Sequence, residues 1–310
     1  MNYDDHNPSG AAPARARSTD APESTDLPTM PPPMEPDLLP PSDLPRYPPL
    51  PEFRAGLSDD LRVPWGWTDV ALFVILGVIG SWVVTWGLAE ASIKFFGVNA
   101  DAVFGDSMST AKSVVLLAGQ ALIDAGAILY LYLMLVARTP EPFWRAIGWR
   151  GMPPPVAPFR ASAVQYLTGG AVMALVITLA GSFLNSKETL PIEQLLQARV
   201  SMLLFSVLGV LVAPLVEETI FRGFLYPVIA RRVGIAAGVG ITGVLFGLTH
   251  AAQLWGGWGQ IALLIVVGLV LTYVRARTGT VTASYFVHLG YNGLQLVGYV
   301  FYVLGSQHLH

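Results

Sequence analysis

Long apolar stretches separated by short polar clusters dominate the chain after about residue 65. Seven such stretches occupy residues 69–89, 112–136, 163–184, 200–226, 234–250, 257–274 and 281–304. At about 1.5 Å of helical rise per residue, segments of this length reach across most or all of a hydrocarbon core. Their apolar residues run continuously instead of alternating, which favours helices over barrel strands. The pattern predicts seven spanning helices, or eight if a turn near Pro214 or Pro227 divides the long stretch at 200–226.

Composition supports a membrane location and excludes several other classes of protein. Only 13% of the residues are charged and 53% are hydrophobic, whereas soluble domains carry about 25% charged residues. The chain has no cysteine, which excludes disulfides, thiolate metal sites and a cysteine nucleophile. A net charge of −3 without a basic patch argues against a nucleic-acid partner. We therefore predict an all-α, multi-pass integral membrane protein.

The first 64 residues differ in composition from the rest of the chain. They hold 15 of the 24 prolines, and 11 acidic against 5 basic residues. Such a segment buries too little apolar surface to fold, so we expect a disordered tail with polyproline II character. The predicted organisation is this acidic, proline-rich tail at 1–64, N-terminal transmembrane helices at 65–199, and a transmembrane core that carries the chemistry at 200–310.

Arginines in alternate loops predict the orientation of the helices. Residues 137–162 contain four arginines, and the loops after the fourth and sixth stretches each contain a pair, Arg231 with Arg232 and Arg275 with Arg277. The loops between them are acidic, balanced or uncharged. Because cytoplasmic loops carry an excess of arginine and lysine, we expect the N-terminal tail to be cytoplasmic.

Ionisable side chains inside the fourth stretch mark a candidate site, because such groups are costly in lipid unless they are paired. Glu217, Glu218 and Arg222 lie in this stretch. Glu218 and Arg222 are four residues apart, so they share a helix face and can form an ion pair. Glu217 points about 100° away on a helix. The spacing therefore predicts one paired and one free glutamate.

Two further stretches each contribute polar residues at a comparable depth. His250 ends the fifth stretch, while His288 and Asn292 share one face of the last stretch. Counting about 1.5 Å per residue from the basic loops, Glu217, His250 and His288 fall at broadly similar depths in the membrane. We therefore expect these side chains to converge.

Two chemistries suit this set of side chains. In the first, Glu217 and His250 activate a water molecule for attack on a carbonyl, and His288 with Asn292 donates hydrogen bonds to the oxyanion. In the second, Glu217, His250 and His288 bind Zn²⁺ and leave a position for a catalytic water. The sequence leaves both open, because both use the same residues and no HExxH motif is present.

Three motifs in a fixed order resemble the type II CAAX prenyl endopeptidase family, also called the CAAX protease and bacteriocin-processing family of intramembrane proteases. The motifs are Glu217-Glu218-x-x-x-Arg222, Phe246-x-x-x-His250 and His288-x-x-x-Asn292. The resemblance covers about residues 200–304. It implies a bundle of about eight transmembrane helices around a conical intramembrane cavity.

The resemblance also implies a role for each motif residue. Glu217 matches the water-activating glutamate and His250 its partner. Glu218 and Arg222 match a supporting pair, and His288 and Asn292 match the positions that stabilise the oxyanion. The implied substrate is a membrane-anchored or lipidated peptide or protein, cut by CAAX-type processing or leader-peptide cleavage, with membrane lipid as a further partner. The family is described both as metal-dependent and as metal-independent, so either no cofactor or a divalent metal such as zinc is expected.

Two interpretations from other classes stay open beside the protease. One is a non-catalytic membrane protein of the same fold that binds peptides or confers immunity. The other is a transporter, since buried glutamate and histidine residues also relay protons. Outside the motifs, Gln120 and Asp124 lie four residues apart in the second stretch, and we expect them to form a hydrogen bond with a structural role.

Overall fold

The computed structural model describes residues 58–184, residue 194 and residues 199–307, and it forms helices without any strand in that part of the chain. The first half contains η2 (Asp59–Leu61), α1 (Trp67–Phe96), α2 (Ala100–Phe104), α3 (Thr110–Val136), α4 (Phe143–Ala146) and α5 (Ser162–Ser182). The second half contains α7 (Arg199–Val207), η3 (Leu208–Val212), α8 (Ala213–Glu218), η4 (Thr219–Leu225), α9 (Tyr226–Val233), α10 (Ile235–Thr249), α11 (Trp258–Thr278) and α12 (Val281–Gln307). Most of the predicted tail, residues 1–57, lies outside the described residues.

Helices occupy all seven predicted spans, but five of them are long and apolar enough to cross a membrane, counted over the described residues. They are Trp67–Phe96, Thr110–Val136, Ser162–Ser182, Leu204–Val233 and Trp258–Thr278. The helix α10 has 15 residues and rises about 22 Å, less than the roughly 30 Å of a hydrocarbon core. The helix α12 is 27 residues long but is interrupted by polar residues such as Ser284, His288 and Asn292. The prediction of seven to eight spans therefore exceeds the number that meets these criteria.

The long fourth span is one continuous helix, so the turn that would have produced an eighth span is not present within Leu204–Val233. Two π-helical segments, η3 and η4, interrupt its α-helical parts. Pro214 and Pro227 are the second residues of α8 and α9, the helices that begin where these two segments end. A proline lacks the backbone N–H that donates to the preceding turn of an α-helix, and its ring clashes with that turn. The wider π turns accommodate both prolines without ending the helix.

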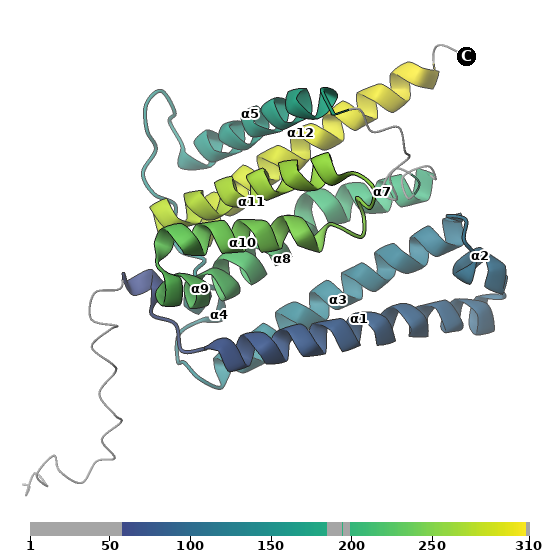
Figure 1. The fold of residues 1–310 in the computed structure, drawn as a ribbon, viewed down its shortest axis with the longest axis horizontal. Coiled ribbons are helices and arrows are strands. Elements are labelled where there is room, and N and C mark those ends of the chain that lie inside the picture. Colours follow the sequence, from purple (N-terminus) through teal and green to yellow (C-terminus); the bar gives the residue numbers. More distant parts are fainter. Residues whose placement is uncertain (1–57, 185–193, 195–198, 308–310) are drawn as a thin grey trace, which may run out of the picture. The chain divides into compact units, whose positions relative to one another are not determined.

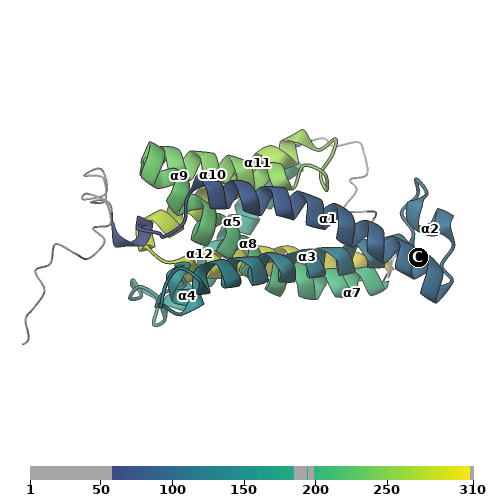
Figure 2. The same ribbon diagram turned by 90° about the horizontal axis from the view of Figure 1, so that it is seen from below.

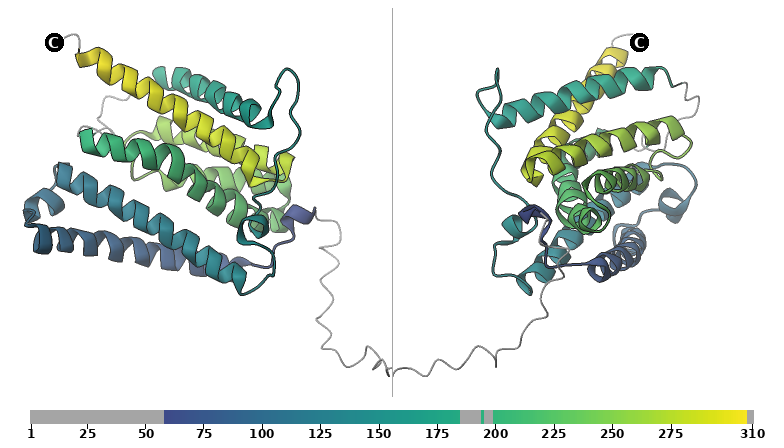
Figure 3. Two further views of the ribbon diagram at one scale, coloured as in Figure 1. Left: turned by 180° about the vertical axis from the view of Figure 1, so that it is seen from behind. Right: turned by 60° about the vertical axis from the view of Figure 1, so that its left-hand side comes forward.

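The helices form three neighbouring pairs. The helices α1 and α3 lie antiparallel with α2 at one end, α10 packs on α11, and α5 packs on α12 (Figures 1 and 3). Glycines permit the closest of these crossings. A Cβ atom at Gly170 of α5 would overlap the carbonyl oxygen of Val287 in α12, and one at Gly290 of α12 would overlap that of Leu167. Small residues of this kind let membrane helices approach closely.

The loops that are rich in arginine meet at one end of the bundle, the end opposite α2 (Figures 1 and 2). There Arg138 pairs with Asp69 at 2.6 Å and Arg275 pairs with Asp60 at 2.7 Å. Arg231 donates to the carbonyl of Val63 at 3.1 Å. These contacts place the alternate basic loops on one side of the bundle. Which side of the membrane they face stays a prediction.

The last residues of the predicted tail are folded, which differs from the expected boundary at residue 64. Leu61 in η2 is 1% exposed and packs against Tyr226 and Ala230 of α9. Asp60 holds the buried Arg275. The proline-rich composition of residues 1–64 does not predict these two contacts, because their partners lie more than 160 residues away in the chain. The packed region therefore begins by residue 59.

Candidate active site

A fully buried ion pair forms the centre of the candidate site. Glu218 ends α8 and Arg222 lies in η4, and both side chains are 0% exposed. Arg222 Nη1 donates to Glu218 Oε1 at 2.9 Å. This is the pair that the spacing of four residues predicts. Charges buried this deeply are stable only with a counter-charge and additional hydrogen bonds.

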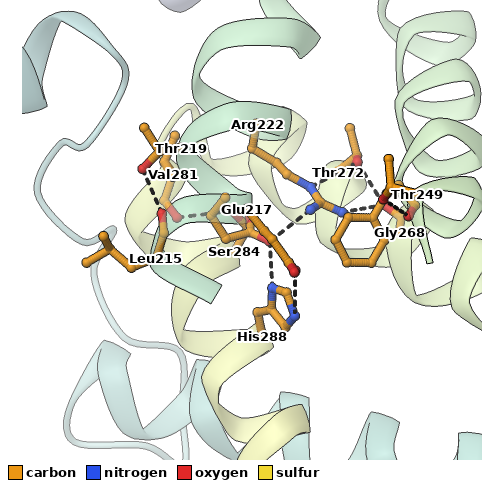
Figure 4. A network of polar contacts seen from close by, with 12 residues as sticks. Leu215, Glu217, Thr219, Arg222, Thr249, Gly268, Thr272, Val281, Ser284 and His288 are labelled. Carbon is orange, nitrogen blue, oxygen red and sulfur yellow. Dashed lines mark hydrogen bonds and ion pairs between the residues drawn. The ribbon is translucent and has the colours of Figure 1, made fainter. Parts of the chain in front are cut away.

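Arg222 finds its other partners on α10 and α11. Its Nε donates to the Thr272 hydroxyl at 3.3 Å, and Nη2 donates to the carbonyl of Gly268 at 3.1 Å. Its guanidinium carbon lies 4.4 Å from the centre of the Phe246 ring, within the range of a cation–π contact. Figure 4 shows the side chain extending toward Gly268 and Thr272. Arg222 thereby joins the fourth span to two neighbouring helices.

Glu217 faces two histidines from different helices. Its Oε1 lies 3.7 Å from Nε2 of His250, and its Oε2 lies 3.7 Å from Nε2 of His288. Figure 4 shows the carboxylate directed at the His288 ring. The Glu217 side chain is 25% exposed, in contrast to Glu218. The tertiary structure therefore brings together the three groups that the depth estimate expects to converge, and no arginine of the described residues pairs with Glu217.

Hydrogen bonds determine which nitrogen of each imidazole faces Glu217. His250 Nδ1 lies 3.0 Å from the carbonyl oxygen of Phe246, which only accepts hydrogen bonds, so Nδ1 carries the hydrogen. His288 Nδ1 lies 3.0 Å from Oε1 of Glu218, and the same reasoning places its hydrogen on Nδ1. Both rings therefore present Nε2 to the same carboxylate.

Asn292, the remaining predicted site residue, is bonded away from this cluster. Its Nδ2 donates to the carbonyl oxygen of Gly209 in η3 at 2.8 Å. In a π-helix the partner of that carbonyl would be the N–H of residue 214, which is a proline. The neighbouring N–H of Ala213 already donates to Leu208. Asn292 therefore satisfies a backbone carbonyl that Pro214 leaves without a donor.

Whether Glu217, His250 and His288 hold zinc stays a prediction. The described residues contain no group of three or more histidine, cysteine, aspartate and glutamate side chains arranged to hold a metal ion.

Sequence patterns missed several residues that hold the site together. Thr272 and Gly268 lie four residues apart in an apolar stretch, and the Thr272 hydroxyl donates to Gly268 at 2.7 Å while it accepts from Arg222. The only sequence signal for these contacts is a polar residue, Thr272, one helical turn after a glycine, Gly268. Gly209 gives no signal at all, because its role arises from Pro214 five residues later.

The motif region of the chain matches one family. Residues 199–294 match the family model described as type II CAAX prenyl endopeptidase Rce1-like. No curated protein and no solved structure shows a significant match to the chain. The matched segment includes Glu217, His250 and His288, whose side chains lie close together in the structure. The chain therefore carries, at residues 199–294, a domain of the Rce1-like type II CAAX prenyl endopeptidases, a family of CAAX-type intramembrane proteases.

Proposed function

We propose that this protein is an endopeptidase that hydrolyses a peptide bond in a membrane-associated or lipidated peptide or protein. Water activated by Glu217 and His250 is the nucleophile. The observation that carries the proposal is the position of Glu217, a partly exposed carboxylate between two imidazole nitrogens at 3.7 Å. The family match supports a protease in general, and this geometry supports a glutamate as its base.

The distances suit a shared water molecule. Glu217 Oε1 and His250 Nε2 are too far apart for a direct hydrogen bond. A water placed beside them reaches both at about 2.8 Å. Glu218 neutralises Arg222 and so keeps Glu217 out of an ion pair. Glu217 therefore remains free to accept a proton.

The proposed reaction proceeds in two steps. First, Glu217 accepts a proton as the water oxygen bonds to the substrate carbonyl carbon, which converts the carbonyl oxygen to an oxyanion. Second, the carbon–nitrogen bond breaks and Glu217 returns the proton to the leaving amine. The products are a carboxylic acid and an amine, which exchange a proton to become a carboxylate and an ammonium group, and the glutamate is regenerated.

The oxyanion donors are His288 and Asn292, and the structure sets a condition on each. His288 uses Nδ1–H for Glu218, so it can donate from Nε2 only when both ring nitrogens are protonated. Asn292 uses one N–H of its amide for Gly209, which leaves the second N–H for substrate. Each donor of this kind typically contributes about 10²–10³-fold in rate.

Comparison of peptide termini in host membranes tests the proposal without a guess at the substrate. Cells expressing the native protein are compared by mass spectrometry with cells expressing Glu217→Gln, which keeps the size of the side chain. Glu141→Gln is the matched control, because Glu141 is exposed in a loop. New termini should be present with the native and control proteins and absent with Glu217→Gln. Identical termini in all three, at equal protein levels, would refute catalysis and favour a peptide-binding protein.

A cleavage assay with purified protein separates the metal-independent and the metal-dependent form of the reaction. We propose that no metal is required, since the described residues form no metal-holding group. Purified protein in lipid vesicles should cleave the identified substrate equally well before and after dialysis against EDTA. Loss of cleavage with EDTA and its recovery with Zn²⁺ would instead assign a metal to Glu217, His250 and His288.

A further inference from the structure

An open pocket of about 650 Å³ lies next to the segment that carries Glu217. Its walls are largely apolar and come from Ala121, Ala125 and Leu129 of α3, Val212 of η3 and Val216 of α8. Val216 directly precedes Glu217 in the chain. One wall of the pocket is therefore formed by the residue adjacent in the chain to the proposed base.

Asp124 is the one carboxylate in this apolar lining. It lies 14 residues from the start and 12 from the end of α3, close to the middle of a candidate span. Gln120 Nε2 donates to its Oδ1 at 2.8 Å, as the spacing of four residues predicts. The ion pairs found among the described residues do not include Asp124. A charged carboxylate at mid-membrane depth without a cation is costly. Its presence there therefore favours a functional partner.

The charges around the pocket favour a cation as that partner. Asp124 and Val216, the residue that precedes Glu217, line the same pocket. Arg222, the buried cation of the neighbouring ion pair, is already neutralised by Glu218. Attraction between opposite charges is strong where water is scarce. A positively charged group in the pocket would therefore be stabilised by Asp124.

We propose that this pocket is a substrate subsite that accepts a lysine or arginine side chain near the scissile bond, with Asp124 as its counter-ion. The aliphatic stem of such a side chain packs on apolar walls while its charged end reaches a polar group. An apolar pocket with one carboxylate matches that chemistry. Gln120 orients the carboxylate and leaves its second oxygen for the substrate. The assignment rests on the proposed peptidase function and names the substrate class.

Binding to the Glu217→Gln protein tests the subsite without any need for cleavage. The probes are myristoylated alanine–leucine peptides that carry one lysine at successive positions, each matched by a peptide with uncharged norleucine at the same position. At one or more positions lysine should bind at least about tenfold more tightly than norleucine, which is the effect of a modest charge pair. Asp124→Asn in the same background should reduce this ratio to about one. Asp101→Asn, at an exposed position of α2, should leave it unchanged.

Three outcomes are distinguishable. Equal affinity for lysine and norleucine at every position would overturn the subsite. A lysine preference that survives Asp124→Asn would assign the cation to another residue and equally overturn it. A preference that requires Asp124, in a protein that shows no Glu217-dependent cleavage in membranes, would support the subsite and refute the peptidase.

Discussion

Asp60 and Arg275 show how a single residue near the N-terminal tail supports the transmembrane core. The Arg275 side chain is 1% exposed and its Nη1 lies 2.7 Å from Asp60 Oδ2. Burial alone would raise the pKa of Asp60. The hydrogen bonds from Ser58 and Arg275 and the charge of Arg275 outweigh burial and hold this pKa below its ordinary value of 3.8. Asp60 is thus the counter-ion of a buried arginine, although it belongs to the predicted tail.

The depressed pKa of Asp60 predicts a stability that depends on pH. Its contribution is fully present above the ordinary pKa of 3.8 and is lost as the pH falls through the lower pKa of the folded state. Asp60→Asn should lower the free energy of unfolding by about 1–3 kcal/mol at pH 7, because it leaves Arg275 without its counter-ion. Thermal unfolding in detergent at pH 7 and pH 3 measures both effects.

Asp59→Asn is the matched control for this prediction, because the neighbouring carboxylate is 86% exposed. The difference between Asp60→Asn and native protein should shrink at pH 3, while Asp59→Asn should match native protein at both values. An Asp60→Asn protein with native stability at pH 7 would contradict the counter-ion role.

At the scale of the element, the fourth span contains both Pro214 and Pro227 and the two glutamates of the candidate site. The segment η3 precedes Pro214 and η4 precedes Pro227, and the two glutamates lie between these π-helical segments. Local π turns rotate the residues that follow relative to those before, so they change which side chains face the site. The hydrogen bond between Asn292 and Gly209 holds the first of these segments against α12.

Substitutions at Asn292 and Pro214 should therefore be coupled. Asn292→Leu should cost about 1–3 kcal/mol of stability, because the Gly209 carbonyl loses its donor. In the Pro214→Ala background residue 214 can donate to that carbonyl, so the same substitution should cost less. A double-mutant cycle of unfolding free energies in detergent measures the coupling. Equal costs in both backgrounds would show that Pro214 does not create the requirement for Asn292.

The crossing of α5 and α12 predicts a second effect at this scale. Gly170→Ala should destabilise the protein by about 1–3 kcal/mol, because the new Cβ overlaps the carbonyl of Val287. Val287 precedes His288, so cleavage should fall as well. Gly169→Ala is the matched control, since nothing lies within 4 Å of a Cβ there. Unfolding in detergent and the membrane cleavage assay measure both effects, and equal behaviour of the two variants would contradict the close crossing.

At the scale of the whole molecule, alternate loops gather at one end of the bundle. The contacts of Arg138, Arg231 and Arg275 with residues 58–69 all lie at this end. The opposite end carries α2 and the turn between α10 and α11. This separation is the one that alternating arginine-rich loops predict. That the basic end and the tail face the cytoplasm stays a prediction.

The absence of native cysteine allows a direct test of this orientation. Single cysteines are placed at Ser18 in the tail and at Ser107, which is exposed between α2 and α3. In intact cells a membrane-impermeant maleimide should label the Ser107 position and not the Ser18 position. After the membrane is permeabilised both should react. Labelling of the Ser18 position alone in intact cells would reverse the proposed orientation.

Local apolar and charged patterns made much of this protein predictable. The positions of the seven helices followed from continuous apolar runs, because the cost of placing a residue in lipid is largely a property of that residue. The pair of Glu218 and Arg222 and the hydrogen bond between Gln120 and Asp124 followed from helical spacing alone. The approach of His250 and His288 to Glu217 followed from their similar depths.

Contacts between distant segments were decided only by the tertiary structure. The sequence by itself determined the helical class, the location of the helices and the identity of the converging groups. It did not determine that Pro214 leaves the fourth span intact, that Asn292 donates to Gly209, or that Asp60 holds Arg275. These depend on π turns and on how each helix is rotated against its neighbours. Periodicity does not encode that rotation, because it is set by the packing of side chains from several helices at once.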